Sequence, residues 1–223
     1  MNHPLDNPVW ASLTSKHSTL ARKTANAARY PADAAPFVAV DVTDAGAVEQ
    51  LSSLVDTGES VLFVGLAPRL PSTWSVEPVA MIAQMTCDLR LLVNDGPPIT
   101  ELSRDQVADM LGLTALVYPH YFRARTIEMG RYFGIYVDGM LAAMAGERMG
   151  FEGHQEISAI CTHPHYAGRG YAQRLTAILS NDILDSGRVP FLHVSHQNDR
   201  AKALYERIGY RFRADIALLA ARR

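Results

Sequence analysis

One segment of the chain constrains the fold more than any other: a strand-like run, a glycine-containing loop and a long helix. Residues 156–162 (EISAICT) have the composition of a buried strand, and the loop that follows carries Gly168 and Gly170. A helix is predicted over 170–186, because apolar residues recur there at helical spacing and Gly187 follows as a stop signal. Such a loop turns backbone N–H groups toward one point, and the helix N-terminus adds unpaired N–H groups and partial positive charge. The segment therefore predicts a binding site for a phosphate or pyrophosphate group.

Two common nucleotide-binding motifs do not explain this loop. The third small residue of a dinucleotide-binding G-x-G-x-x-G would fall on Gln173, and the chain contains no Walker A sequence. Taken alone, the loop is also compatible with an ordinary strand-to-helix turn that uses glycine for its backbone freedom. The phosphate-binding interpretation therefore depends on the rest of the chain.

The flanking segments predict an α/β fold in which helices cover a mixed central sheet. Strand patterns lie at 37–42, 61–66, 79–86, 131–137, 140–148, 156–162, 190–195 and 210–220, and helical patterns at 44–55, 104–117, 170–186 and 198–208. Residues 21–29 are compatible with a further helix. The pair Asp138-Gly139 between two predicted strands is typical of a type I′ hairpin turn.

The length of the chain, 223 residues, exceeds that of one ordinary domain. The strongest turn signal is Asn94-Asp95-Gly96-Pro97-Pro98, and we place a boundary there. We therefore expect an N-terminal α/β subdomain over residues 1–98 and a second domain over residues 99–223.

Composition narrows the class of protein further. The formal net charge of −2 argues against non-specific binding of nucleic acid. The two cysteines, Cys87 and Cys161, lie far apart in the sequence, which argues against a disulfide scaffold and fits a reducing compartment. We see no secretory signal, and no apolar run approaches the roughly 18 residues of a membrane span. We expect a cytoplasmic protein with neither nucleic-acid nor membrane partners.

Three motifs, in this order along the chain, resemble those of the GNAT acetyltransferase superfamily. Pro164 and Tyr166 resemble the turn that precedes the family's phosphate loop. Residues 167–172 (AGRGYA) resemble its acyl-CoA pyrophosphate motif, Gln/Arg-x-x-Gly-x-Gly/Ala, with Ala167 in place of the usual Gln or Arg. Residues 198–210 (NDRAKALYERIGY) resemble its N-x-x-A-x-x-L-Y-E-x-x-G-[FY] helix.

The resemblance covers residues 99–223 and implies one acyltransferase domain of the GNAT fold there. The runs 147–170 and 190–194 look like the domain of glycine N-acyltransferase-type proteins. The preceding residues 1–98 would then be a partial, degenerate copy of the same fold. We expect that part to have a structural role or to form a wall of the acceptor pocket.

The resemblance implies an acyl-CoA-dependent N-acyltransferase. Acetyl-CoA, or another acyl-CoA, would be the co-substrate, and a primary amine of a small molecule or an amino acid would attack it directly in a ternary complex. No metal is implied, and a homodimer is compatible with the resemblance. A non-catalytic acyl-CoA-binding sensor, or a partner-binding module, stays open as the alternative because a fold does not by itself prove an activity.

The same resemblance assigns a set of cofactor-binding residues. Ile160, Cys161 and Thr162 would offer backbone groups to the pantetheine arm. Asn198 and Tyr205 on the later helix would complete the site. The phosphates would lie on the loop and on the start of the helix, at Ala167, Gly168, Arg169, Gly170, Tyr171, Ala172 and Gln173.

Tyr205 and two base candidates would carry the chemistry. Tyr205 matches the family's acidic tyrosine near the CoA sulfur. Glu156 is the first candidate base and resembles the catalytic glutamate of the histone-acetyltransferase branch. His193 is the second, because an imidazole titrates near neutral pH. Each has a structural alternative: a core tyrosine, a solvated carboxylate at a strand end, and a hydrogen-bonded core histidine.

Strict strand alternation over 156–162 adds a prediction about side-chain direction. It places Glu156 on the same sheet face as Ile160 and Thr162, and it places Ala159 on the opposite face. On that opposite face Cys161 would be inert core, since a cysteine among apolar strand residues is rarely a nucleophile.

Other catalytic classes receive less support. His163-x-His165 and His193-x-x-His196 admit a metal site, but zinc needs three or four converging ligands and no H-E-x-x-H helix is present. A serine hydrolase is disfavoured because the chain contains no G-x-S-x-G.

Overall fold

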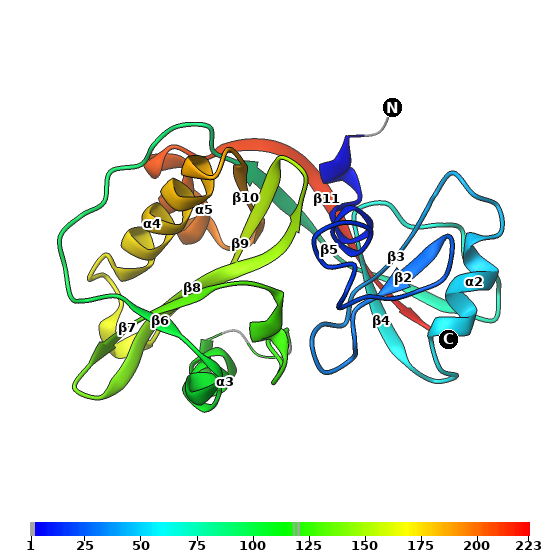
Figure 1. Ribbon diagram of the computed structural model, residues 1–223, viewed down its shortest axis with the longest axis horizontal. Coiled ribbons are helices and arrows are strands. Elements are labelled where there is room, and N and C mark those ends of the chain that lie inside the picture. The colour runs from blue at the N-terminus through cyan, green and yellow to red at the C-terminus, as the bar shows by residue number, and fades with distance from the viewer. Residues whose placement is uncertain (1–2, 118, 120) are drawn as a thin grey trace.

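The computed structural model describes residues 3–117, 119 and 121–223. Their strands form a large mixed sheet of eight strands and a separate antiparallel sheet of three, confirming the predicted α/β class (Figure 1). The large sheet has the order β4 (Ser60–Val64), β11 (Arg211–Arg222), β5 (Ser75–Thr86), β10 (Val189–Ser195), β9 (His154–Thr162), β8 (Met140–Phe151), β7 (Tyr132–Val137) and β6 (Thr100–Leu102). The small sheet has the order β1 (Arg22–Lys23), β2 (Ala27–Arg29) and β3 (Val38–Val40).

Helices cover both faces of the large sheet. The helices are α1 (Pro8–Leu13), α2 (Ala47–Leu54), α3 (Val107–Val117), α4 (Tyr171–Asp185) and α5 (Asp199–Ile208). Figure 1 shows α4 and α5 side by side on one face and α3 on the other, while α2 packs on the small sheet. None of the helices in the described part of the chain is long and apolar enough to span a membrane.

The predicted hairpin at residues 131–148 is confirmed. Strands β7 and β8 pair antiparallel, with Val137 opposite Met140 across the turn. Asp138 and Gly139 have φ values of 52° and 77°, as both central positions of a type I′ turn require.

The prediction of a helix over residues 21–29 is wrong. This stretch forms β1 and β2, and Ala27, Ala28 and Arg29 are all buried there. The Arg29 guanidinium donates to the Glu59 carboxylate and to the backbone oxygen of Leu54, so tertiary contacts outweigh the helix propensity of alanine. A helix that the sequence analysis did not predict, α1, lies earlier and begins with Pro8 in its first turn.

The large sheet is continuous across the boundary that we placed at residue 98. Strand β5 lies between β10 and β11, and β4 pairs with the other edge of β11. Strand β11 runs across the molecule as one long curved strand and pairs with β5 from Arg211 to Arg222 (Figure 1). Residues 1–98 and 99–223 therefore share one sheet, and their division into two domains stays a prediction.

Strands β9 and β10 pair only where they begin. Their parallel ladder joins His154–Glu156 to Val189–Phe191, after which β10 continues along β5 and β9 along β8. Between Ser158 and Cys161, β9 carries one residue more than β8 opposite it, and Ala159 has a φ of 53°. This β-bulge bends β9, and the sheet opens between the two strands.

The bulge also changes which side chains share a face. Ile157 and Ile160 both pack in the apolar cluster beneath α4, whereas Ala159 and Cys161 pack with residues of α3 and β7. The predicted alternation over 156–162 is therefore wrong in its middle, because the bulge reverses the pattern after Ser158. Glu156 and Ile160 consequently do not share a face.

Candidate active site

A first cavity, of about 440 Å³, lies where β9 and β10 separate. Its walls are the end of β9, the loop before α4, and one side of α5. The structure brings all of the predicted cofactor residues to this cavity: Ile160, Cys161, Thr162, Ala167, Gly168, Arg169, Gly170, Tyr171, Ala172, Gln173, Asn198 and Tyr205.

The loop before α4 leaves open space above its backbone. Gly168 and Gly170 have φ values of 80° and 78°, in the left-handed region that favours glycine. A Cβ atom at either position would meet nothing within 4 Å, so the space beside the loop is not filled by the protein itself. Gly170 is the N-cap of α4 and offers no side chain to its first turn. The N–H groups of this turn therefore stand ready for an external acceptor.

A second cavity, of about 330 Å³, adjoins the first and has several residues in common with it. The shared residues are Val117, Ile160, Cys161, Asn198, Ala201 and Tyr205. The N-terminal half contributes much of its apolar wall, through Phe37, Val64, Val79, Ala80 and Ile82. Tyr205 is buried, packs against Tyr210 and lines both cavities, so its side chain lies at their junction.

Glu156 lies below the second cavity and does not line it. Its carboxylate accepts hydrogen bonds from Arg148 Nε and Nη2 at 2.8 and 2.6 Å, and from His193 Nδ1 at 2.8 Å. Although burial alone would raise the pKa of Glu156, the charge and hydrogen bonds of Arg148, together with His193, lower it to about 2. The alternative of a solvated carboxylate is wrong, because the side chain is fully buried.

His193 does line the second cavity, and its hydrogen bonds assign the roles of its two ring nitrogens. Gln84 accepts a hydrogen bond from Arg213 through its Oε1 atom, so its amide nitrogen faces the Leu5 carbonyl and His193. The Gln84 N–H therefore donates to Nε2 of His193, 2.9 Å away. Nδ1 of His193 then donates its N–H to Glu156.

The sequence analysis missed Gln84, Arg148 and Arg213. Gln84 interrupts the apolar run of β5, and this interruption was the one sequence signal of a polar role. In the structure the Gln84 side chain is fully buried. Arg148 lies over the ring of Phe37, 5.0 Å from its centroid. Among the described residues that line the second cavity, Arg148 carries the only formal charge.

Two rival chemistries receive no support from the geometry. Burial raises the pKa of the Cys161 thiol to about 12, which agrees with the expectation that this cysteine is inert core. The rings of His163 and His165 meet edge to face, and the half-buried His196 pairs with Asp215. Within residues 3–117, 119 and 121–223, no three His, Cys, Asp or Glu side chains converge as metal ligands.

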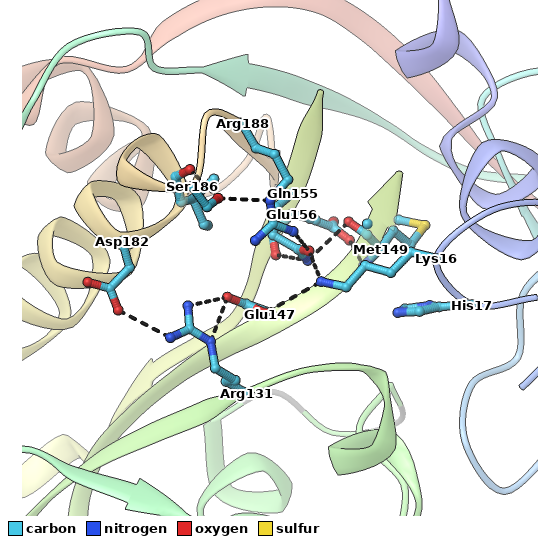
Figure 2. Close-up of polar contacts among 12 residues, drawn as sticks. Lys16, His17, Arg131, Glu147, Met149, Gln155, Glu156, Asp182, Ser186 and Arg188 are labelled. Carbon is cyan, nitrogen blue, oxygen red and sulfur yellow. Dashed lines mark hydrogen bonds and ion pairs between the residues drawn. The ribbon is translucent and has the colours of Figure 1, made fainter. Parts of the chain in front are cut away.

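A third cavity, of about 520 Å³, lies near the start of β10 and is lined mainly by charged side chains. Figure 2 shows Arg131 between Glu147 and Asp182, and Lys16 of the N-terminal segment reaching toward Glu147 and Gln155. These opposite charges satisfy one another. The cluster therefore fastens the N-terminal segment to β8 and β9.

Comparison with known proteins places this architecture in a family. A family model described as FR47-like protein matches residues 132–217. A GNAT-family protein from Novosphingobium aromaticivorans, known from a crystal structure, is 34% identical in sequence to this chain. The match covers 100% of this chain and 99% of that protein, with a TM-score of 0.89. The chain belongs to the GNAT family. The predicted membership is therefore confirmed, while the likeness to glycine N-acyltransferase-type proteins stays a prediction.

More distant GNAT structures share the fold over nearly the whole chain. A GCN5-related N-acetyltransferase from Kribbella flavida is 17% identical, with a TM-score of 0.68 over 97% of this chain and 95% of its own. A GCN5-related N-acetyltransferase-like protein from Streptococcus suis is 15% identical, with a TM-score of 0.51 over 98% and 95%. None of the curated proteins matches the chain.

Proposed function

We propose that the chain is an acyl-CoA-dependent N-acyltransferase that uses acetyl-CoA and acylates a primary amine of a small molecule or an amino acid. The observation that carries this proposal is the junction of the first and second cavities at Cys161, Asn198 and Tyr205. Two substrates bound in the two cavities would both contact these shared residues. This arrangement suits direct transfer in a ternary complex.

The first cavity suits the acyl-CoA. The N–H groups of the loop and of the first turn of α4 would bind the pyrophosphate. The pantetheine arm would lie along residues 160–162, because the edge of β9 that faces β10 takes no part in their ladder beyond Glu156. Ala167 offers no polar side chain to the phosphates, so the backbone and the nearby cations would supply the binding.

The second cavity suits the acceptor. Its amine, once neutral, would attack the thioester carbon, so that a C–N bond forms and the C–S bond breaks. The Tyr205 hydroxyl would give its proton to the departing sulfur, and the attacking amine would lose a proton to a base. No Asp or Glu lines this cavity among the described residues, so its wall favours the neutral amine over the ammonium form.

The contacts favour His193 over Glu156 as the base. Glu156 has a strongly lowered pKa and does not line the second cavity, so it would act as a positioning residue that holds Nδ1–H of His193. His193 Nε2 would first exchange its hydrogen bond from the Gln84 N–H for one from the acceptor amine, and it would then accept the amine proton. The ionised Glu156 would then stabilise the imidazolium.

The test is the release of CoA thiol from acetyl-CoA in the presence of a panel of small amines and amino acids. We expect turnover with some of them, and Tyr205→Phe should lower kcat by about 10²-fold or more while CoA binding stays unchanged. Longer acyl-CoA donors in the same assay define the acyl chain that the enzyme accepts. Binding of acetyl-CoA without turnover on any amine would instead favour the acyl-CoA sensor.

A further inference from the structure

Positive charge gathers around the first cavity. Arg169 from the loop and Arg200 and Arg207 from α5 all line it, and no Asp or Glu does so among the described residues. Arg200, Leu204 and Arg207 follow one another at helical spacing, so they form one stripe along α5. The two α5 arginines are separated by about 10 Å along the helix axis. This cavity is therefore cationic in a chain whose formal net charge is −2.

These three arginines have no carboxylate partner within the described part of the chain. By contrast, Arg131, Arg148 and Arg213 each lie 2.6 Å from a carboxylate oxygen. Arg169 instead lies over the ring of Tyr166, 5.1 Å from its centroid. Guanidinium groups that line a hollow without an internal counter-charge are suited to an anionic ligand, and phosphate matches their planar fork.

Arg200 and Arg207 belong to the α5 wall of the cavity, whereas Arg169 and the backbone N–H groups belong to the loop and the start of α4. One pyrophosphate bound at the α4 N-terminus would occupy the loop side, which leaves the α5 stripe for a further phosphate. Resting on the donor proposed above, we propose that Arg200 and Arg207 recognise the 3′-phosphate of the nucleotide. The enzyme would thereby select coenzyme A thioesters over dephospho-CoA thioesters and over pantetheine thioesters that lack the nucleotide.

The charges are exposed to solvent, so their contribution is moderate and depends on salt. One arginine–phosphate contact corresponds to about a tenfold change in Kd. Because the screening length falls from about 10 Å at 0.1 M salt to about 3 Å at 1 M, most of the preference for the 3′-phosphate should vanish at high salt.

Calorimetric titration with CoA and with 3′-dephospho-CoA, without any acceptor, tests this inference. We expect the wild type to bind CoA about tenfold more tightly, and Arg200→Gln combined with Arg207→Gln to bind the two nucleotides almost equally. Lys202→Gln is the matched control, because it removes one positive charge from the same helix at a residue that does not line the cavity. It should keep the wild-type preference.

An unchanged preference in the arginine variant, or an equal loss in Lys202→Gln, would overturn the inference. Thermal unfolding of each variant separates these outcomes from misfolding, and Arg207→Gln alone provides a milder change for the same comparison. A wild type that binds neither nucleotide would overturn the proposed function as well. A wild type that binds both equally would overturn only the role of the α5 arginines.

Discussion

Replacing Glu156 with glutamine perturbs the buried charge network at its centre. The pKa of Glu156 falls from the usual 4.5 to about 2 in the folded protein, which corresponds to about 3 kcal/mol of stability. Because the folded-state pKa is the lower one, this stability is present above about pH 4.5 and is lost as pH falls toward 2. The variant also leaves Arg148 without its buried counter-charge, so we expect a cost of about 3–5 kcal/mol at neutral pH.

Urea unfolding of the wild type and Glu156→Gln at several values between pH 7 and pH 3 measures both quantities. The gap in free energy of unfolding should be largest at pH 7 and should shrink by about 2 kcal/mol at pH 3. Glu101→Gln, at an exposed position on β6, is the control and should follow the wild type. A gap that stays constant over this range would refute the assignment of a strongly lowered pKa to Glu156.

Three further experiments test other parts of the structure. Gly170→Val should weaken CoA binding at least tenfold and should lower the stability by about 1–2 kcal/mol. Gly187→Val is the control, because Gly187 has a φ of 75° and surroundings as open as those of Gly170. It should lower the stability by a similar amount but leave CoA binding intact. Phe37→Leu should raise the KM of the acceptor several-fold with little change in that of acetyl-CoA, since Phe37 lines only the second cavity. Burial, with Lys16 nearby, lowers the pKa of His17 to about 4, so the wild type should lose about 3 kcal/mol as pH falls from 6.5 to 4, and His17→Gln should unfold in urea without that dependence.

The glycine loop and the helices α4 and α5 could be predicted because each depends on a contiguous stretch of sequence. Gly168 and Gly170 have the positive φ values that only a glycine adopts easily, and the apolar stripe of α4 repeats without interruption. The helix prediction for the Ala-rich stretch 21–29 was wrong because the conformation of this stretch depends on distant residues. Its strand conformation depends on partners such as Glu59, which a local pattern does not contain.

All of the residues expected to bind the cofactor line the first cavity, whereas the polar residues around the second cavity were predicted only in part. Glu156 was expected to be a base because its sequence pattern cannot show that Arg148, on the neighbouring strand, binds its carboxylate. Gln84 and Arg213 come from strands far apart in the sequence and meet only through the sheet order. The bulge at Ala159 leaves no mark in composition, yet it decides which way the later residues of β9 point.

The position of β11 in the large sheet has a consequence for how the protein is made. This strand is the last in chain order, yet it separates β4 from β5 and pairs with both. During synthesis the N-terminal half must therefore wait, with two strand edges unpaired, until residues 211–222 leave the ribosome. Long-range pairings of this kind slow folding and leave edges open to aggregation. The wall that Phe37 and Val64 give to the second cavity would consequently be among the last features to form.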